Sequence, residues 1–129
     1  MSETATIAGT ITQTVSPSGP SVSFILGAPS ITSSSSTGAT LSYDEGGSKV
    51  IKVAQGDGVV SVSFDTVADA DILYIGTDYP IDVKLNGSSD AISLAAGGFI
   101  LTYAGSMTAA TVEATTSNDA TISLCILGA

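Results

Sequence analysis

The sequence predicts an all-β fold, an antiparallel β-sandwich or a jelly-roll-like arrangement with an N-terminal strand or arm. Three observations predict it: apolar and polar residues alternate in short runs, turn residues stand at nearly every junction, and no long window has a helical period. The runs are rich in Thr, Val and Ile, whose branched side chains fit a pleated surface. At 129 residues the chain has the length of one domain.

The first element is predicted within residues 4–15. Ile7, Ile11 and Val15 fall on one side of an extended chain, and threonines fall on the other. This alternation is typical of a strand with one face covered by hydroxyl groups. No charged residue occurs between Glu3 and Asp44, so we expect this part of the chain to contact other proteins.

The remaining predicted strands are short and rich in aliphatic residues. They are residues 21–26, 39–43, 49–54, 59–64, 71–75, 81–85, 91–95, 99–103, 111–115 and 120–127. Hairpin loops are predicted at 44–47, 55–58, 86–90 and 117–119, and Asn86-Gly87 is the strongest hairpin signal because both residues tolerate positive φ. Residues 77–80 predict a turn, and residues 67–71 offer a single helical turn.

These elements predict one domain with three parts. We expect residues 1–26 to form an N-terminal strand or arm, residues 27–38 a Ser-rich loop, and residues 39–129 the body of the sandwich.

The charge of the chain argues against nucleic acid as a partner. The formal net charge is −9, with three lysines and no arginine, whereas phosphate binding depends on Lys and Arg. The same acidity argues against anionic lipid surfaces, and the longest apolar run, residues 94–101, is too short to span a membrane. The N-terminus lacks the pattern of a secretory signal, so we expect synthesis in a cytoplasm.

The composition also leaves little for catalysis. Without histidine, no Ser-His or Cys-His arrangement exists, so we expect no enzyme activity, no catalytic residues and no cofactor. Lys49 and Lys52 are predicted to be solvated surface lysines, and Cys125, the single cysteine, a buried apolar residue.

One acidic group raises the question of calcium. Asp65, Asp69 and Asp71 lie close in sequence, with Asp78 nearby, but their spacing is not that of an EF-hand loop. We therefore expect a solvated acidic loop and no metal site.

Several predicted strands carry large apolar residues on both faces, as residues 24–26, 72–75, 99–101 and 124–127 show. A strand in a two-layer sandwich needs only one apolar face. Either loops of the chain cover the second face or another subunit does. We favour another subunit, because almost no charge interrupts residues 91–112.

The second half of the chain resembles small virion proteins of tailed bacteriophages. The residues that carry the resemblance are aliphatic strands joined by Asn-Gly or Gly-Gly turns, namely ILYIGTDYPIDVKLNG (72–87), ISLAAGG (92–98) and ATISLCILG (120–128). The resemblance implies a β-sandwich structural protein of the virion, a capsid decoration or cement protein or a neck or tail component. It implies a homo-oligomer that contacts major capsid or neck and tail proteins, and it carries over no catalytic residue.

The predicted function is therefore structural, and apolar residues are its predicted contacts. The predicted interface residues are Ile7, Ile11, Val15, Phe24, Ile25, Leu26, Ile126 and Leu127. The alternative is a carbohydrate-binding β-sandwich module, which needs an exposed aromatic patch around Tyr74, Tyr79 or Tyr103.

Overall fold

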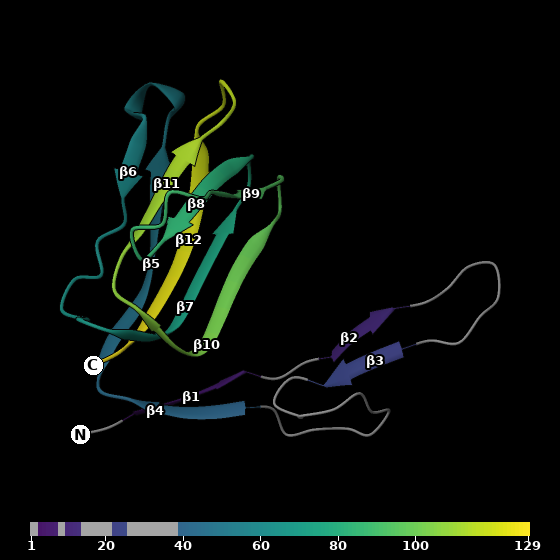
Figure 1. The fold of residues 1–129 in the computed structure, drawn as a ribbon, viewed down its shortest axis with the longest axis vertical. Helices are drawn as coiled ribbons and strands as arrows, with labels where there is room; N and C mark the ends of the chain where they lie inside the picture. Colours follow the sequence, from purple (N-terminus) through teal and green to yellow (C-terminus); the bar gives the residue numbers. More distant parts are fainter. Residues whose placement is uncertain (1–2, 8–9, 14–21, 26–38) are drawn as a thin grey trace. The chain divides into compact units, whose positions relative to one another are not determined.

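The computed structural model describes residues 3–7, 10–13, 22–25 and 39–129, and it divides the chain into two compact units, residues 1–42 and 43–129 (Figure 1). The strands at the N-terminal end form two small sheets. One pairs β1 (Glu3–Ile7) with β4 (Ala39–Tyr43), and the other pairs β2 (Thr10–Gln13) with β3 (Val22–Ile25). The single strand predicted over residues 4–15 is therefore two strands with different partners.

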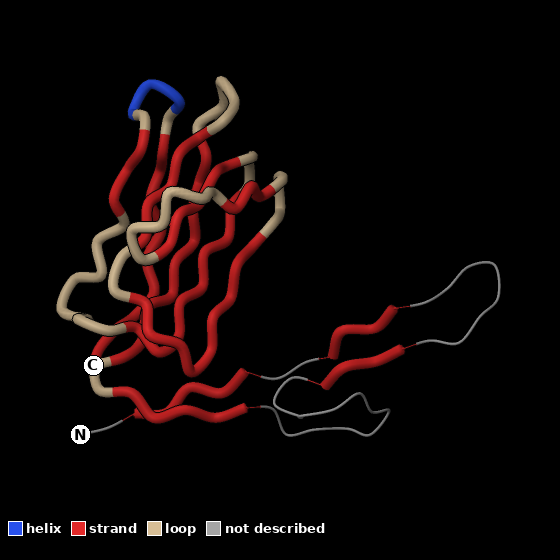
Figure 2. The backbone as a smooth tube through the Cα atoms, viewed as in Figure 1, coloured by secondary structure: helices blue, strands red, loops and turns tan. Residues whose placement is uncertain are grey.

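The second unit consists almost entirely of strands joined by short connections (Figure 2). Its elements are β5 (Glu45–Val53), the 3-10 turn η1 (Gln55–Asp57), β6 (Val59–Ser61), β7 (Ala70–Thr77), β8 (Ile81–Leu85), β9 (Ile92–Leu94), β10 (Phe99–Met107), β11 (Ala110–Ala114) and β12 (Ala120–Gly128). The helical turn thus lies at residues 55–57 and not at 67–71. No helix in the described part of the chain is long and apolar enough to cross a membrane.

The eight strands form two antiparallel sheets that pack on each other. Sheet I has the order β10-β7-β12-β5 and sheet II the order β6-β11-β8-β9. The first four strands pair in reverse order with the last four, as in one long hairpin, which gives the pairs β5·β12, β6·β11, β7·β10 and β8·β9. Two further pairs join these within each sheet: β7·β12 in sheet I and β8·β11 in sheet II. This is the strand order of a jelly roll, so the prediction of an all-β sandwich is confirmed.

The tip of that long hairpin is the Asn86-Gly87 turn. Asn86 and Gly87 have φ of 52° and 72°, and Ser88 N–H donates a 3.0 Å hydrogen bond to the Leu85 carbonyl. Two successive positive φ values are those of the tight turn that suits the right-handed twist of a hairpin. The strongest hairpin prediction is confirmed: the turn joins β8 to β9, which pair with each other.

Three other predicted hairpins are wrong. Residues 55–58 and 117–119 connect strands of opposite sheets, and residues 44–47 contribute three positions to β5. Turn residues show where a chain can reverse, but burial of apolar faces decides which strands pair. In β5, Gly46 has φ of 132°, and a Cβ there would lie 2.0 Å from the Ile126 carbonyl oxygen, so this glycine permits close pairing with β12.

The core lies between the two sheets and is aliphatic except for Phe64. Residues that alternate along each strand point inward, and the largest fully buried ones are Leu73, Ile75, Ile81, Ile122, Val53, Val83 and Val112. Both sheets therefore bury one face, and their outward faces determine what the molecule presents to a partner.

Candidate functional site

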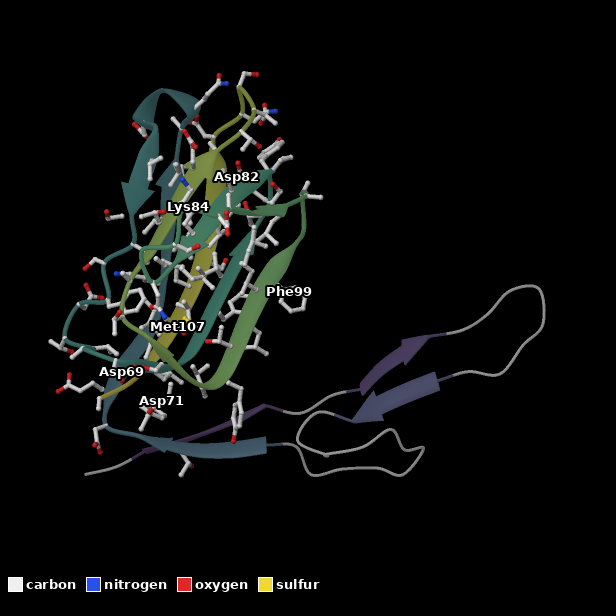
Figure 3. The ribbon with its side chains drawn as sticks, in the orientation of Figure 1. Asp69, Asp71, Asp82, Lys84, Phe99 and Met107 are labelled. Atoms are coloured by element: carbon white, nitrogen blue, oxygen red, sulfur yellow. The ribbon has the colours of Figure 1, made fainter. Side chains whose placement is uncertain are left out.

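The outward face of sheet II is polar. Its strands alternate in the usual way, with core residues inward and mostly charged or hydroxyl residues outward. The outward residues are Val59, Ser61, Asp82, Lys84, Ser93, Thr111 and Glu113. The Ser93 hydroxyl donates a 2.7 Å hydrogen bond to Asp82, and both Asp82 and Lys84 extend from β8 in Figure 3.

The outward face of sheet I is different, because apolar residues occupy it on all four strands. We call the following residues the outer apolar face: Val50, Ile72, Tyr74, Phe99, Leu101, Tyr103, Cys125 and Leu127. All of them except Tyr103 alternate with a residue packed in or against the core, such as Ile51, Leu73 and Ile100. Ser48, Lys52, Thr121 and Ser123 are the polar residues on the same side of the sheet.

Three members of the outer apolar face are well exposed. Val50 is 64% exposed, Phe99 60% and Leu101 37%, although residues of this type are usually buried. In Figure 3 the Phe99 ring projects beyond β10 at the border of the sheet. Exposed aliphatic and aromatic side chains on one sheet face are a feature of contact surfaces.

An aromatic pair forms part of this face. The rings of Tyr74 and Phe99 stack with centroids 5.7 Å apart and planes inclined by 29°. The Tyr74 ring lies over Gly76, since a Cβ at Gly76 would be 2.6 Å from the Tyr74 hydroxyl oxygen. Glycine at position 76 therefore lets the tyrosine lie flat on the sheet beside Phe99.

A polar hollow of about 260 Å³ adjoins the Tyr74 ring. Its lining includes Thr77, Asp78, Thr121 and Ser123. The Asp78 carboxylate accepts a 2.7 Å hydrogen bond from Thr121 N–H, which fixes this acid at the end of β12. The hollow offers hydroxyl and carboxylate groups next to an aromatic surface.

The predicted interface residues fall in three groups. Ile126 is 3% exposed and belongs to the core between the sheets, so its prediction as a subunit contact is corrected. Leu127, the next residue of β12, points to the opposite side and lies on the outer apolar face. It is only 8% exposed, so it is likewise not available for a contact. The other six are in the N-terminal unit.

Of those six, four are in described strands. Ile7 ends β1, Ile11 of β2 is opposite Phe24 of β3, and Ile25 of β3 is opposite Thr10. Val15 and Leu26 lie outside the described residues. These contact predictions remain untested.

Phe99, Leu101 and Val50 were not among the predicted contacts. The signal for Phe99 and Leu101 was present in the sequence, because residues 99–101 are apolar on both faces. Period-two alternation separates the two faces of such a run without showing which one is inside. Val50 lies between Lys49 and Ile51, so the sequence indicates an outward apolar residue less clearly at this position.

The structure also shows the contacts of Lys49 and Asp65 and the burial of Cys125. Lys49 is not a solvated lysine: it is half-buried, and its Nζ donates to the Ser63 carbonyl at 2.6 Å and to Asp65 at 3.0 Å. Hydrogen bonds from Lys49 and from the Ser63 hydroxyl, with the charge of Lys49, hold the pKa of Asp65 below its ordinary value. Cys125 is half-buried on the outward side rather than fully buried.

The acidic residues considered for calcium do not form one site. Asp65 pairs with Lys49, whereas Asp69 accepts hydrogen bonds of 2.9 and 3.0 Å from the Ser106 hydroxyl. Across the described ranges, no three Asp, Glu, Cys or His side chains are grouped to hold a metal ion.

Comparison of the chain with protein-family models, with curated proteins and with solved structures finds no match.

Proposed function

We propose that this chain is a non-enzymatic structural subunit of a phage virion, a capsid decoration or cement protein or a neck or tail component. One observation carries the proposal: the outward side chains of sheet I are mostly apolar, while those of sheet II, apart from Val59, are polar. This asymmetry is expected of a subunit that is covered by neighbouring subunits on one face and exposed to solvent on the other.

The apolar side chains that are exposed on this face support a protein contact. Strands of about nine residues at about 3.3 Å per residue, four across at a spacing of about 4.8 Å, give a face of about 570 Å². Full burial of one Leu or Phe side chain contributes about 1.5–3 kcal/mol relative to exposure. Covering Val50, Phe99 and Leu101 therefore gives a partner a substantial hydrophobic gain.

The assignment to a virion rests on the resemblance of residues 71–129 to small phage virion proteins. Jelly rolls occur in viral capsid domains and in lectins, so the topology agrees with the proposal without selecting it. The uncharged stretch between Glu3 and Asp44 supports a second set of contacts, through Ile7, Ile11, Val15, Phe24, Ile25 and Leu26.

Incorporation into particles tests this proposal. Tagged chain supplied during infection should be found by gold labelling on intact virions of the phage that encodes it. Substituting Phe99→Ser and Leu101→Ser should reduce the labelling strongly, whereas the matched pair Thr111→Ala and Glu113→Gln on sheet II should not. Thermal unfolding of each variant confirms that it is folded. Particles without the wild-type chain would refute the virion assignment.

The stacked Tyr74–Phe99 pair beside the polar hollow favours one second candidate, a carbohydrate-binding module. Sugar rings pack on aromatic surfaces while their hydroxyls bond to groups like those of Asp78 and Ser123. A glycan array decides between the two: a ligand lost on Tyr74→Ala and retained on Tyr79→Ala supports this candidate, and an empty array rejects it. Tyr79 is a suitable control because it is 40% exposed and does not line the hollow.

A further inference from the structure

We infer that two copies of the chain pair edge to edge through β10, antiparallel, with a two-fold axis at Leu101. The inference rests on the proposed function and names the partner at that surface, which is a second copy. The pairing would join two copies of sheet I into one continuous sheet.

The four edge strands of the sandwich are not equivalent. Among the described strands, β6 and β9 are edges of three residues each, and β5 is an edge that carries Glu45, Lys49 and Lys52. The fourth edge, β10, has nine residues and no charge. Short or charged edges resist pairing with another chain, whereas a long uncharged edge is a template for it.

The residues of β10 whose backbone groups face the open edge are also those whose side chains lie on the outer apolar face. Thr77 N–H donates a 3.1 Å hydrogen bond to the Gly98 carbonyl, so Gly98 faces β7. Because hydrogen-bonding direction alternates along an antiparallel strand, the N–H and C=O groups of Phe99, Leu101 and Tyr103 face the open edge. These residues also belong to the outer apolar face.

The absence of charge on β10 makes it the edge at which two copies repel each other least. Each chain carries a formal charge of −9, so two copies approach best where neither presents charge. The strand sequence FILTYAGSM offers nothing that an oppositely charged partner could use. An antiparallel edge is also complementary to itself, as a two-fold interface requires.

The regular part of β10 sets the register. It begins at Phe99, after the turn at Gly97, and its pairing with β7 becomes irregular between Tyr103 and Met107. The midpoint of residues 99–103 is Leu101. An axis there places Leu101 opposite Leu101 of the second copy and Phe99 opposite Tyr103 of the second copy, so that each such pair exchanges both backbone hydrogen bonds.

We call the contact between the two β10 strands the β10 seam, and the area that it buries limits the affinity of the pair. Five residues span about 17 Å, and two sheets about 10 Å apart with their outward side chains are about 20 Å thick, so both copies together bury about 700 Å². Stable complexes need about 1,000 Å² or more. The pair is therefore weak in dilute solution and becomes occupied where an assembly raises the local concentration.

Disulfide trapping tests the inference. In the full chain with Cys125→Ala, Leu101→Cys should give about ten-fold more cross-linked dimer under mild oxidation than Val50→Cys or Val59→Cys, because only position 101 faces itself within disulfide range. Val50 lies on the same face and Val59 on sheet II, and both are more than half exposed. A mixture of the Phe99→Cys and Tyr103→Cys chains should cross-link more than either alone.

The outcomes separate this inference from the proposed function. Equal or greater cross-linking at Val50→Cys, or none at Leu101→Cys even at the highest protein concentration, overturns the β10 seam and leaves the structural role standing. Cross-linking at Leu101→Cys in a chain that is absent from virions supports the seam and refutes the virion assignment.

Discussion

At the scale of single residues, Asn86 supports the fold in two ways. Its backbone adopts the positive φ of the hairpin tip, and its side chain connects that tip to residues 106–108. The amide Nδ2 donates to the Ser106 carbonyl at 3.0 Å, and Oδ1 accepts from Thr108 N–H at 2.8 Å. Asparagine suits this position because it tolerates the left-handed region and carries both a donor and an acceptor.

Substitutions at Asn86 separate these two contributions. Asn86→Gly keeps the backbone freedom and loses the side-chain hydrogen bonds, so we expect the free energy of unfolding to fall by about 1–2 kcal/mol. Asn86→Ala also strains the backbone and should lose about 1 kcal/mol more. Urea denaturation measures both, and a glycine variant as stable as the wild type would contradict the role of the side chain.

The Asp65–Lys49 pair predicts a pH dependence. Since the pKa of Asp65 is lowered in the folded state, its contribution to stability is complete above the ordinary carboxyl pKa of about 4 and is lost as the pH falls through the folded pKa. Asp65→Asn should therefore destabilise the protein near neutral pH, with the difference from the wild type vanishing toward about pH 2.

Thermal unfolding across that range measures this effect. The exposed control Asp119→Asn should show no comparable loss. A constant difference between wild type and Asp65→Asn at every pH would mean that the ion pair is not its source.

At the scale of elements, local signals and non-local pairing differ in what the sequence reveals. The Asn86-Gly87 turn is predictable because two adjacent residues determine it. The structure of residues 44–47 is not predictable from neighbouring residues. It depends on the close approach of Gly46 to Ile126, which lies 80 positions later in the chain. Likewise, Leu124, Ile126 and Leu127 are apolar on both faces of β12, so only the sheet partners show that Ile126 is inside.

The glycines of β5 test this explanation. Gly46→Ala places a Cβ against the β12 backbone at a φ unsuited to alanine, so we expect a loss of about 2 kcal/mol or more in the free energy of unfolding. Gly47→Ala, in the next position, meets nothing within 4 Å and should change stability by about 0.5 kcal/mol at most. Equal losses in chemical denaturation would show that strand propensity, not the close contact, governs this strand.

At the scale of the whole molecule, the core cluster of the described residues lies in the second unit. Every residue of the core cluster lies between Val53 and Ile126. The sequence predicted the sandwich and the presence of apolar residues on both faces. It could not show that the second apolar face belongs to sheet I alone, because that depends on how the long hairpin rolls into two layers.

Residues 43–129 should consequently fold without the N-terminal unit. The fragment contains all eight strands of the jelly roll, so we expect a single cooperative unfolding transition and the β-type circular dichroism of the full chain. An unfolded fragment would mean that residues 1–42 supply part of the core. Loss of residues 1–15 from the full chain should weaken assembly while leaving this body folded.

The central claim is that other subunits cover the exposed residues of the outer apolar face, Val50, Phe99 and Leu101, and sedimentation velocity at increasing concentration tests it most directly. We predict that the wild-type chain forms oligomers as concentration rises and that Phe99→Ser with Leu101→Ser shifts it to monomer without loss of folding. A wild-type chain that remains a monodisperse monomer at high concentration, with its Phe99 and Leu101 side chains in water, would contradict the account.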